Sequence, residues 1–255
     1  SISYGLVAQY IQFDNKFYQL FRPTLKDSTG KIIQNAITFN SNTGVNFLRY
    51  GGFVQLGTRL LDDRLAISTG VRADANSFVS SSQNPLDQLS PRISLSYALT
   101  NTWNFSASYG TYYRLPSYTQ LAYSNNGFNN PGKYINSNHY VAGFEFLPSS
   151  TTRFTFEGFY KGYKNYPVSM LDKISLANKG IEFGAIGNEP IQQDGTGRAY
   201  GFEFFAQQKL TEKFFGVFSY TLYWSEFSGL DKKLKPASWD NRHLISTTVG
   251  YKLPK

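Results

Sequence analysis

The chain has 255 residues, and its 25 Lys and Arg against 17 Asp and Glu give a formal net charge of +8. Aromatic residues make up 17% of the sequence and charged residues only 16%, whereas a soluble domain is about 25% charged. This aromatic content excludes an intrinsically disordered chain, and the absence of cysteine excludes disulfides and thiolate metal sites. The cations are scattered along the chain, so we do not expect nucleic-acid binding.

No apolar run approaches the ~18 residues of a membrane-spanning helix, so any membrane crossing would use strands. Segments rich in aromatic and β-branched residues alternate with period two, which indicates strands. We predict ten strands, at residues 1–13, 43–60, 64–77, 90–99, 102–113, 138–147, 151–164, 198–210, 213–226 and 242–253.

The connections between these strands alternate in length. Tight turns are expected at 61–63, 100–101, 148–150 and 211–212. Long loops are expected at 14–42, 78–89, 114–137, 165–197 and 227–241. Short turns on one side and long loops on the other are typical of an outer-membrane barrel, with the turns periplasmic and the loops extracellular.

The alternation sorts the side chains into two rows. One row is apolar and carries no charge in the strand middles, as at Phe144, Phe156 and Phe202. The other row is rich in Ser, Thr, Gly, Asn and Gln and carries the charges. Its charged members are Arg49, Arg59, Arg64, Arg72, Asp74, Arg92, Glu145, Arg153, Glu157, Lys161, Glu203, Lys209, Lys213 and Lys252.

Two folds would produce these rows: a soluble sandwich with the apolar row as its core, and a membrane barrel with that row facing lipid. Aromatic residues at both ends of the apolar row, such as Trp103 and Tyr109, favour the barrel. Six residues at about 3.3 Å each span about 20 Å, close to the ~25 Å apolar band of such barrels. We therefore predict an all-β chain, an antiparallel transmembrane β-barrel segment of about ten strands with short periplasmic turns and long extracellular loops.

Several motifs, in this order, resemble the barrel of TonB-dependent outer-membrane receptors. They are LSPRISLSYALT at 89–100, ASYGTYYRLP at 107–116, TFEGFYK at 155–161, GRAYGFE at 197–203, SYT at 219–221 and DNRH at 240–243. The resemblance covers about residues 45–255, and residues 1–44 are less diagnostic. It implies a cell outer-membrane protein of a Gram-negative bacterium that imports a scarce nutrient, such as an iron chelate, a corrinoid or an oligosaccharide.

The resemblance further implies that the protein is not an enzyme and needs no cofactor. Its partners would be outer-membrane lipid or detergent, its own plug domain, TonB and a small nutrient ligand. Receptors of this family close a 22-stranded barrel around the plug, and ten strands fall short of that number. We expect residues 1–255 to be an internal fragment of one barrel domain without the plug, which would aggregate alone through its unpaired edges.

Aromatic side chains and one arginine cluster in the expected loops. They are Tyr112, Tyr113, Arg114, Tyr118, Tyr123, Phe128, Tyr134, Tyr163 and Tyr166. Such residues can stack on a ligand or hold an anionic chelate, but tyrosines also anchor barrels at the membrane boundary. Arg72 and Arg92 in the polar row could steer an anionic solute, or pair with carboxylates or the plug. The candidate substrate-binding residues are Tyr112, Tyr113, Arg114, Tyr118, Arg72 and Arg92.

Two alternatives to transport stay open. Asp240 and His243 could form a water-activating pair at a barrel rim, as in ten-stranded omptin-type outer-membrane proteases, and the chain could instead form a structural or adhesive barrel. We expect no metal site, because the sequence lacks a dense ligand cluster. The segment 194–198 reads as a flexible loop before a strand.

Overall fold

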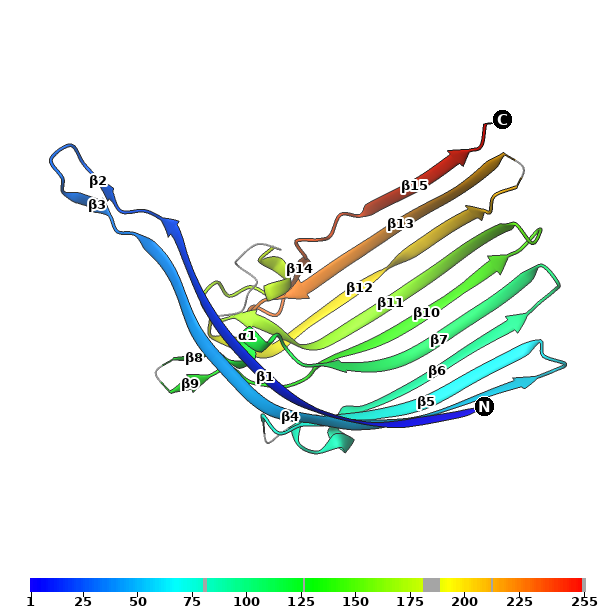
Figure 1. Cartoon of the computed structure of the whole chain (residues 1–255), viewed down its shortest axis with the longest axis horizontal. Helices are drawn as coiled ribbons and strands as arrows, with labels where there is room; N and C mark the ends of the chain where they lie inside the picture. Colours follow the sequence, from blue (N-terminus) through cyan, green and yellow to red (C-terminus); the bar gives the residue numbers. More distant parts are fainter. Residues whose placement is uncertain (80–81, 126, 181–188, 212, 254–255) are drawn as a thin grey trace.

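The computed structural model describes residues 1–79, 82–125, 127–180, 189–211 and 213–253. Its main feature is one curled, eleven-stranded antiparallel sheet (Figure 1). The strands are β1 (Ile2–Arg22), β4 (Ile37–Leu60), β5 (Leu65–Asn76), β6 (Leu89–Ala98), β7 (Trp103–Arg114), β10 (Ile135–Phe146), β11 (Thr152–Ser169), β12 (Ile191–Gln208), β13 (Phe214–Ser228), β14 (Leu234–Pro236) and β15 (His243–Tyr251). They pair in chain order as far as β13, which pairs with both β14 and β15.

The remaining elements are short. They are the pairs β2 (Leu25–Lys26) with β3 (Ile32–Gln34) and β8 (Ser124–Asn125) with β9 (Phe128–Asn129), and the helices η2 (Pro85–Gln88), α1 (Tyr118–Leu121) and η3 (Leu176–Asn178). No helix in the described ranges is long and apolar enough to cross a membrane.

All ten predicted strands are present, but the boundary predicted for the 14–42 loop is wrong. β1 continues to Arg22 and β4 starts at Ile37, so that these strands stay paired well beyond Phe13 and Val45. Past Phe13 the polar run Asp14-Asn15-Lys16 occupies both faces and interrupts the period-two signal, although backbone pairing continues. The two strands form an arm that projects beyond the rest of the sheet and carries β2 and β3 at its tip (Figure 1).

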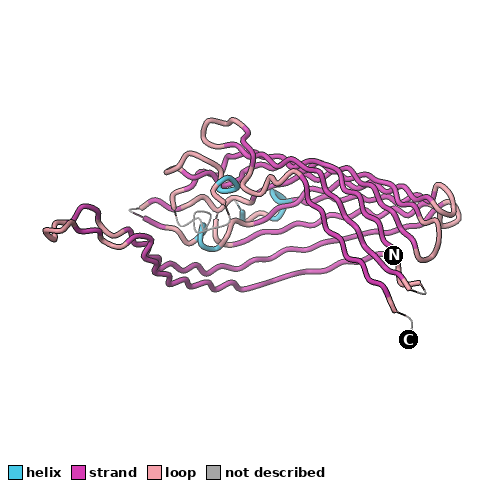
Figure 2. Tube along the Cα trace, turned by 90° about the horizontal axis from the view of Figure 1, so that it is seen from above, coloured by secondary structure: helices cyan, strands magenta, loops and turns pink. Residues whose placement is uncertain are grey.

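The connections lie at two distinct ends of the sheet. Short turns connect β4 to β5, β6 to β7, β10 to β11 and β12 to β13, and both chain termini lie at this end, which we call the turn end (Figure 1). The longer connections and the short helices gather at the opposite end, which we call the loop end (Figure 2). The predicted alternation of short and long connections is therefore present in the fold.

The two side-chain rows form two faces of the sheet. We call the face that carries the apolar row the outer face. On this face the strand register aligns a belt of aromatic rings across five neighbouring strands, on the side nearer the loop end. The belt consists of Tyr109, Tyr140, Tyr160, Tyr200 and Trp224. Neighbouring ring centroids in this belt lie 4.9–6.4 Å apart. A second group, Trp103, Phe146 and Phe154, stacks nearer the turn end. The two groups are six residues apart along a strand, so they are about 20 Å apart.

The outer face remains uncovered by any part of the described chain. Phe156 and Phe202 are both 51% exposed although they lie between the two aromatic groups. A sandwich would bury this row in a core, so its exposure excludes the sandwich and fits a surface that contacts lipid. The opposite face, which carries Arg72, Arg92 and Glu157, is called the inner face below.

Ala142 tests the lipid contact, because it is exposed on the outer face between the aromatic groups. We expect Ala142→Arg in the full-length protein to lower the free energy of unfolding in lipid vesicles by about 2–4 kcal/mol. Ala142→Leu should leave that free energy nearly unchanged, because lipid accommodates the added bulk. Equal destabilisation by both variants in denaturant titrations would indicate a packed protein core instead.

Candidate functional site

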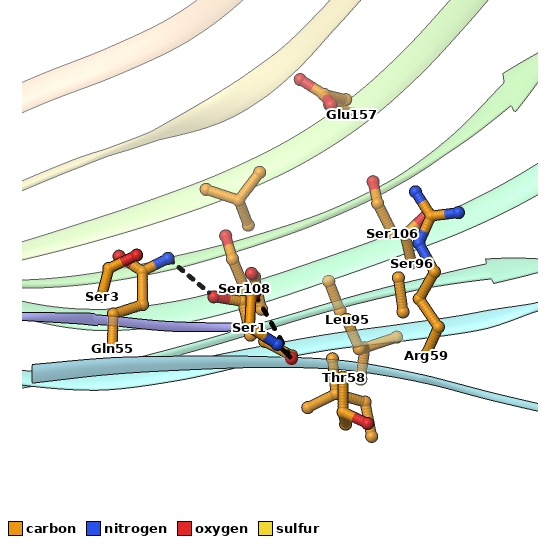
Figure 3. A pocket seen from close by; sticks show the side chains of 17 residues that line it. Ser1, Ser3, Gln55, Thr58, Arg59, Leu95, Ser96, Ser106, Ser108 and Glu157 are labelled. Atoms are coloured by element: carbon orange, nitrogen blue, oxygen red, sulfur yellow. Dashed lines mark hydrogen bonds between the residues drawn. The ribbon is translucent and has the colours of Figure 1, made fainter. Parts of the chain in front are cut away.

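The inner face is hollowed near the turn end, where its side chains are small. A cavity of about 820 Å³ opens over seven serines, Ser1, Ser3, Ser68, Ser94, Ser96, Ser106 and Ser108. Arg59 and Glu157 also line it (Figure 3). Gln55 donates a hydrogen bond of 2.9 Å from Nε2 to Ser68 Oγ. Because serine side chains are short, they leave space here for a polar group larger than a single side chain.

Three of the predicted site residues meet in a second cavity of about 430 Å³, closer to the loop end. It is lined by Arg72, Arg92 and Tyr112 among others. Arg72 donates from Nε and Nη2 to the two carboxylate oxygens of Asp74, each at 2.6 Å. The positive charge of Arg72 is therefore neutralised by a carboxylate of the same strand. The Arg92 guanidinium lies 4.6 Å from the centroid of the Tyr112 ring, a cation–π contact that leaves its hydrogen-bond donors available.

The other three predicted residues, Tyr113, Arg114 and Tyr118, line a third cavity of about 310 Å³ together with Arg49 and Tyr134. The rings of Tyr113 and Tyr134 contact edge to face, with centroids 6.4 Å apart. The six candidate residues thus divide into two groups of three. Arg49 belongs to the predicted polar row, but no sequence pattern assigns it to a site.

A fourth cavity, of about 450 Å³, is the most aromatic. Its lining includes Tyr112, Arg114, Tyr166, Phe227 and Trp239. Phe227 is 3% exposed and packs against Tyr166, with ring centroids 4.4 Å apart. Lys161, Tyr163 and Tyr223 complete the aromatic and cationic lining. The period-two pattern places these three on the inner face, whereas the contribution of Trp239 has no sequence signal because it lies in a loop.

Loops fold inward at the loop end and fix these cavities. The α1 segment places Leu121 against Val45 and Phe47 of β4, in a small buried cluster. The Asn130 side chain, 5% exposed, links distant segments: its Nδ2 donates to the carbonyls of Gln120 and Glu189 at 3.0 and 2.9 Å, and its Oδ1 accepts from the Ile191 amide at 2.8 Å. One amide therefore holds the β7–β10 loop against the start of β12.

Comparison with known proteins identifies the family. Residues 2–254 match the model of the TonB dependent receptor-like, beta-barrel family. The chain belongs to this family. It is therefore part of a Gram-negative outer-membrane receptor barrel, and the family is one of non-enzymatic transporters. The search of curated proteins found no match.

Solved receptor structures share the fold. The pyoverdine outer membrane receptor FpvA of Pseudomonas aeruginosa PAO1, bound to pyoverdine, superposes with a TM-score of 0.67 at 15% identity, over 100% of this chain and 36% of that one. The FrpB iron transporter of Neisseria meningitidis gives 0.59 at 16% identity, over 84% and 32%. The alcaligin receptor FauA of Bordetella pertussis gives 0.56 at 15% identity, over 99% and 40%.

At 15–16% identity, these matches show a shared fold and do not show a shared ligand. The chain spans about a third of the length of the FrpB and FpvA chains that it matches.

The structure does not bring Asp240 and His243 together as a water-activating pair. The Asp240 side chain is 2% exposed and lies 3.3 Å from Arg242 Nη2. His243 pairs with Leu222 in the outer-face row, and its Nδ1 is 2.8 Å from the Tyr220 hydroxyl. Asp240 thus has an ion pair with Arg242 but no hydrogen bond to either carboxylate oxygen, and His243 is held by Tyr220 instead.

The expectation of a flexible loop at 194–198 is wrong, because this segment is part of β12. Asp194 forms an ion pair with Lys232, which attaches the β13–β15 connection to this strand. Within the described ranges, no group of three acidic or histidine side chains could hold a metal ion.

The Asn130 link leads to a prediction about the loops. Asn130→Ala removes three hydrogen bonds and leaves the buried Ile191 amide without its acceptor from Asn130, which costs ~1–3 kcal/mol for a group left unsatisfied. Limited proteolysis of the intact receptor barrel should therefore cleave the inward loops roughly tenfold faster or more. The exposed neighbour Asn129 is the control, and Asn129→Ala should be cleaved like the unaltered protein. Equal cleavage of the two variants would show that Asn130 does not hold the loops.

Proposed function

We propose that this chain is one part of the wall of an outer-membrane receptor that binds a scarce nutrient and imports it with energy from the TonB complex. The observation that carries the proposal is the set of adjoining cavities on the inner face, lined by Arg92, Tyr112, Arg114 and Trp239. Ligand pockets typically combine an aromatic lining with a few polar groups that fix orientation. The outer face, by contrast, has only the features of a lipid boundary.

The nutrient belongs to one of three classes: an iron chelate, a corrinoid or an oligosaccharide. FrpB is named as an iron transporter, FpvA is bound to pyoverdine, and FauA is named for alcaligin. These names make an iron chelate the first class to test. Aromatic rings and guanidinium groups suit the conjugated or anionic parts of such ligands.

The remaining parts of the machinery would come from the rest of the parent protein. We infer that this chain is an internal fragment of its barrel, with the loop end outside the cell and the turn end in the periplasm. The hollow over the seven serines is the place where a plug domain would lie against this wall. TonB would act on that plug from the periplasmic side.

Transport is tested by uptake of a labelled ferric chelate, a corrinoid and an oligosaccharide into cells with and without the parent gene. We expect uptake of one class to be saturable and to fall to background when either the parent gene or TonB is deleted. If no class is lost with the parent gene, the structural or adhesive barrel becomes the better function. Uptake that needs the gene but not TonB would contradict energy-coupled import.

Tyr112 tests whether the cavities bind the nutrient, because it lines both the second and the fourth cavity. Loss of a ring that stacks on a ligand or supports Arg92 is worth about 0.5–2 kcal/mol. Tyr112→Ala should therefore raise the half-saturation concentration for uptake roughly 3- to 30-fold. Tyr112→Phe should stay near the unaltered value, and Tyr123→Ala, outside the cavities, serves as the control. Identical uptake by the Tyr112→Ala and Tyr123→Ala variants would remove Tyr112 from the binding site.

A further inference from the structure

We propose that the cavity between Arg49 and Arg114 is an oxyanion subsite, which takes a carboxylate or similar anionic group of the imported ligand. This proposal rests on the proposed function and names the chemistry of its substrate. The cavity, of about 310 Å³, is also lined by Tyr134 and Ser117. The first support for the proposal is that two arginines from separate strands line one small space.

The fold places these two guanidinium groups together. Arg49 lies on β4 and Arg114 at the end of β7, and these strands are separated in the sheet by β5 and β6. The chain after Arg114 turns back over the inner face, where Leu115, Pro116 and Tyr118 line the same cavity. Tyr118 packs against Phe47 of β4 with ring centroids 6.0 Å apart, which holds the loop across the gap.

Neither arginine is neutralised by the described part of the chain. No carboxylate oxygen of a described residue lies within 4.0 Å of the nitrogens of Arg49 or Arg114. Two other arginines toward the loop end are paired with carboxylates, Arg72 with Asp74 and Arg198 with Glu226. Arg49 and Arg114 therefore bring two positive charges to one cavity with no described carboxylate to neutralise either of them.

The donors around the cavity also lack acceptors. Arg49 Nε is buried without a hydrogen-bond partner, and Tyr134 is only 5% exposed. The fully buried side chain of Asn76, the strand partner of Arg49, lies close enough to donate to the Tyr134 oxygen, which leaves the hydroxyl hydrogen of Tyr134 without an acceptor. Buried donors without acceptors are rare and destabilising. An oxyanion supplies several lone pairs to such a cluster, which a neutral sugar hydroxyl does only weakly.

Tyr134 is suited to donate to an anion. Its burial raises the pKa of its phenol above the ordinary value of 10.0, so the hydroxyl is protonated and can donate at neutral pH. The guanidinium groups are permanently charged and their planar forks match a carboxylate bidentately. The combination of two forks and a neutral hydroxyl donor is selective for a negatively charged oxygen group.

The size of the cavity assigns it to one part of a ligand. This cavity, of about 310 Å³, is at the lower limit of the ≈ 300–1,000 Å³ that sites for whole small molecules occupy, so it has room for a small anion or for the anionic arm of a larger ligand. Arg114 also lines the aromatic cavity of about 450 Å³. The body of the ligand would lie against the rings of that larger cavity, while its anionic arm reaches between the two arginines.

The test uses the full-length receptor in detergent, with citrate and inorganic phosphate as probes in titration calorimetry. Citrate tests a carboxylate and phosphate tests a tetrahedral oxyanion, and binding should weaken as salt is raised. Arg49→Gln and Arg114→Gln should each weaken binding about tenfold or more, because a hydrogen bond to a charged group is worth ~1.5–3 kcal/mol. Arg49→Lys should lie between, since it keeps the charge but loses the fork. Lys252→Gln, which removes an exposed cation near the turn end, should bind like the unaltered receptor.

The opposite results would overturn the subsite. One such result is that neither citrate nor phosphate binds, as would happen if a plug carboxylate already filled the cavity. The other is that Lys252→Gln weakens probe binding as much as the Arg49→Gln and Arg114→Gln variants do. Circular dichroism and heat-modified mobility of each variant verify that it is folded. Failure of the proposed function can be distinguished from failure of the subsite, because it would show as unchanged nutrient uptake after deletion of the parent gene. Normal TonB-dependent uptake together with unaltered probe binding in the two Gln variants would remove the subsite alone.

Discussion

The structure depends on one constraint, the need to hydrogen-bond every backbone group inside a bilayer. An antiparallel ladder meets it strand by strand, and the pleat of that ladder sends successive side chains to opposite faces. One face must then suit lipid and the other water or protein. The exposed rings of Phe156 and Phe202 and the serines opposite them follow from this single geometry. A shift of one residue in register would exchange the two faces, so the register is strongly specified between the aromatic groups.

The same constraint explains which features could be predicted from the sequence. All ten long strands were located because alternation persists wherever one face meets lipid. The predicted end of the first strand is wrong because Asp14 and Asn15 are polar on opposite faces although pairing continues. On the inner face, alternation correctly grouped Arg72 and Arg92 in one row. It could not reveal that Arg72 is matched by Asp74, since a charge list contains no distances.

The loops limit prediction of the candidate site for a different reason. The contacts that bring Arg49 near Arg114 depend on the chain after Arg114 folding back onto β4, which lies far away in sequence. Asn130 holds the same loop through Gln120 and Ile191, one of them 61 residues away. No periodic pattern encodes such long-range contacts. In the sequence Tyr134 is therefore one tyrosine among many, although in the fold it is distinguished by its burial and by a hydroxyl hydrogen without an acceptor.

The unpaired hydrogen-bond donors at the loop end differ from the paired charges elsewhere in the sheet. Some arginines of the wall are paired with carboxylates, as Arg153 is with Glu145 at 2.6 Å. Between Arg49 and Tyr134 the donors remain buried and unmatched, which lowers the stability of the empty barrel. A ligand that supplies the missing acceptor relieves this energy on binding, so that affinity depends on the anionic group rather than on contact area. In the proposed site the adjacent aromatic cavity would contribute less selectively, since rings such as Trp239 stack on many ligand shapes. The anionic group and the body of the ligand would then be bound by two neighbouring cavities that share Arg114.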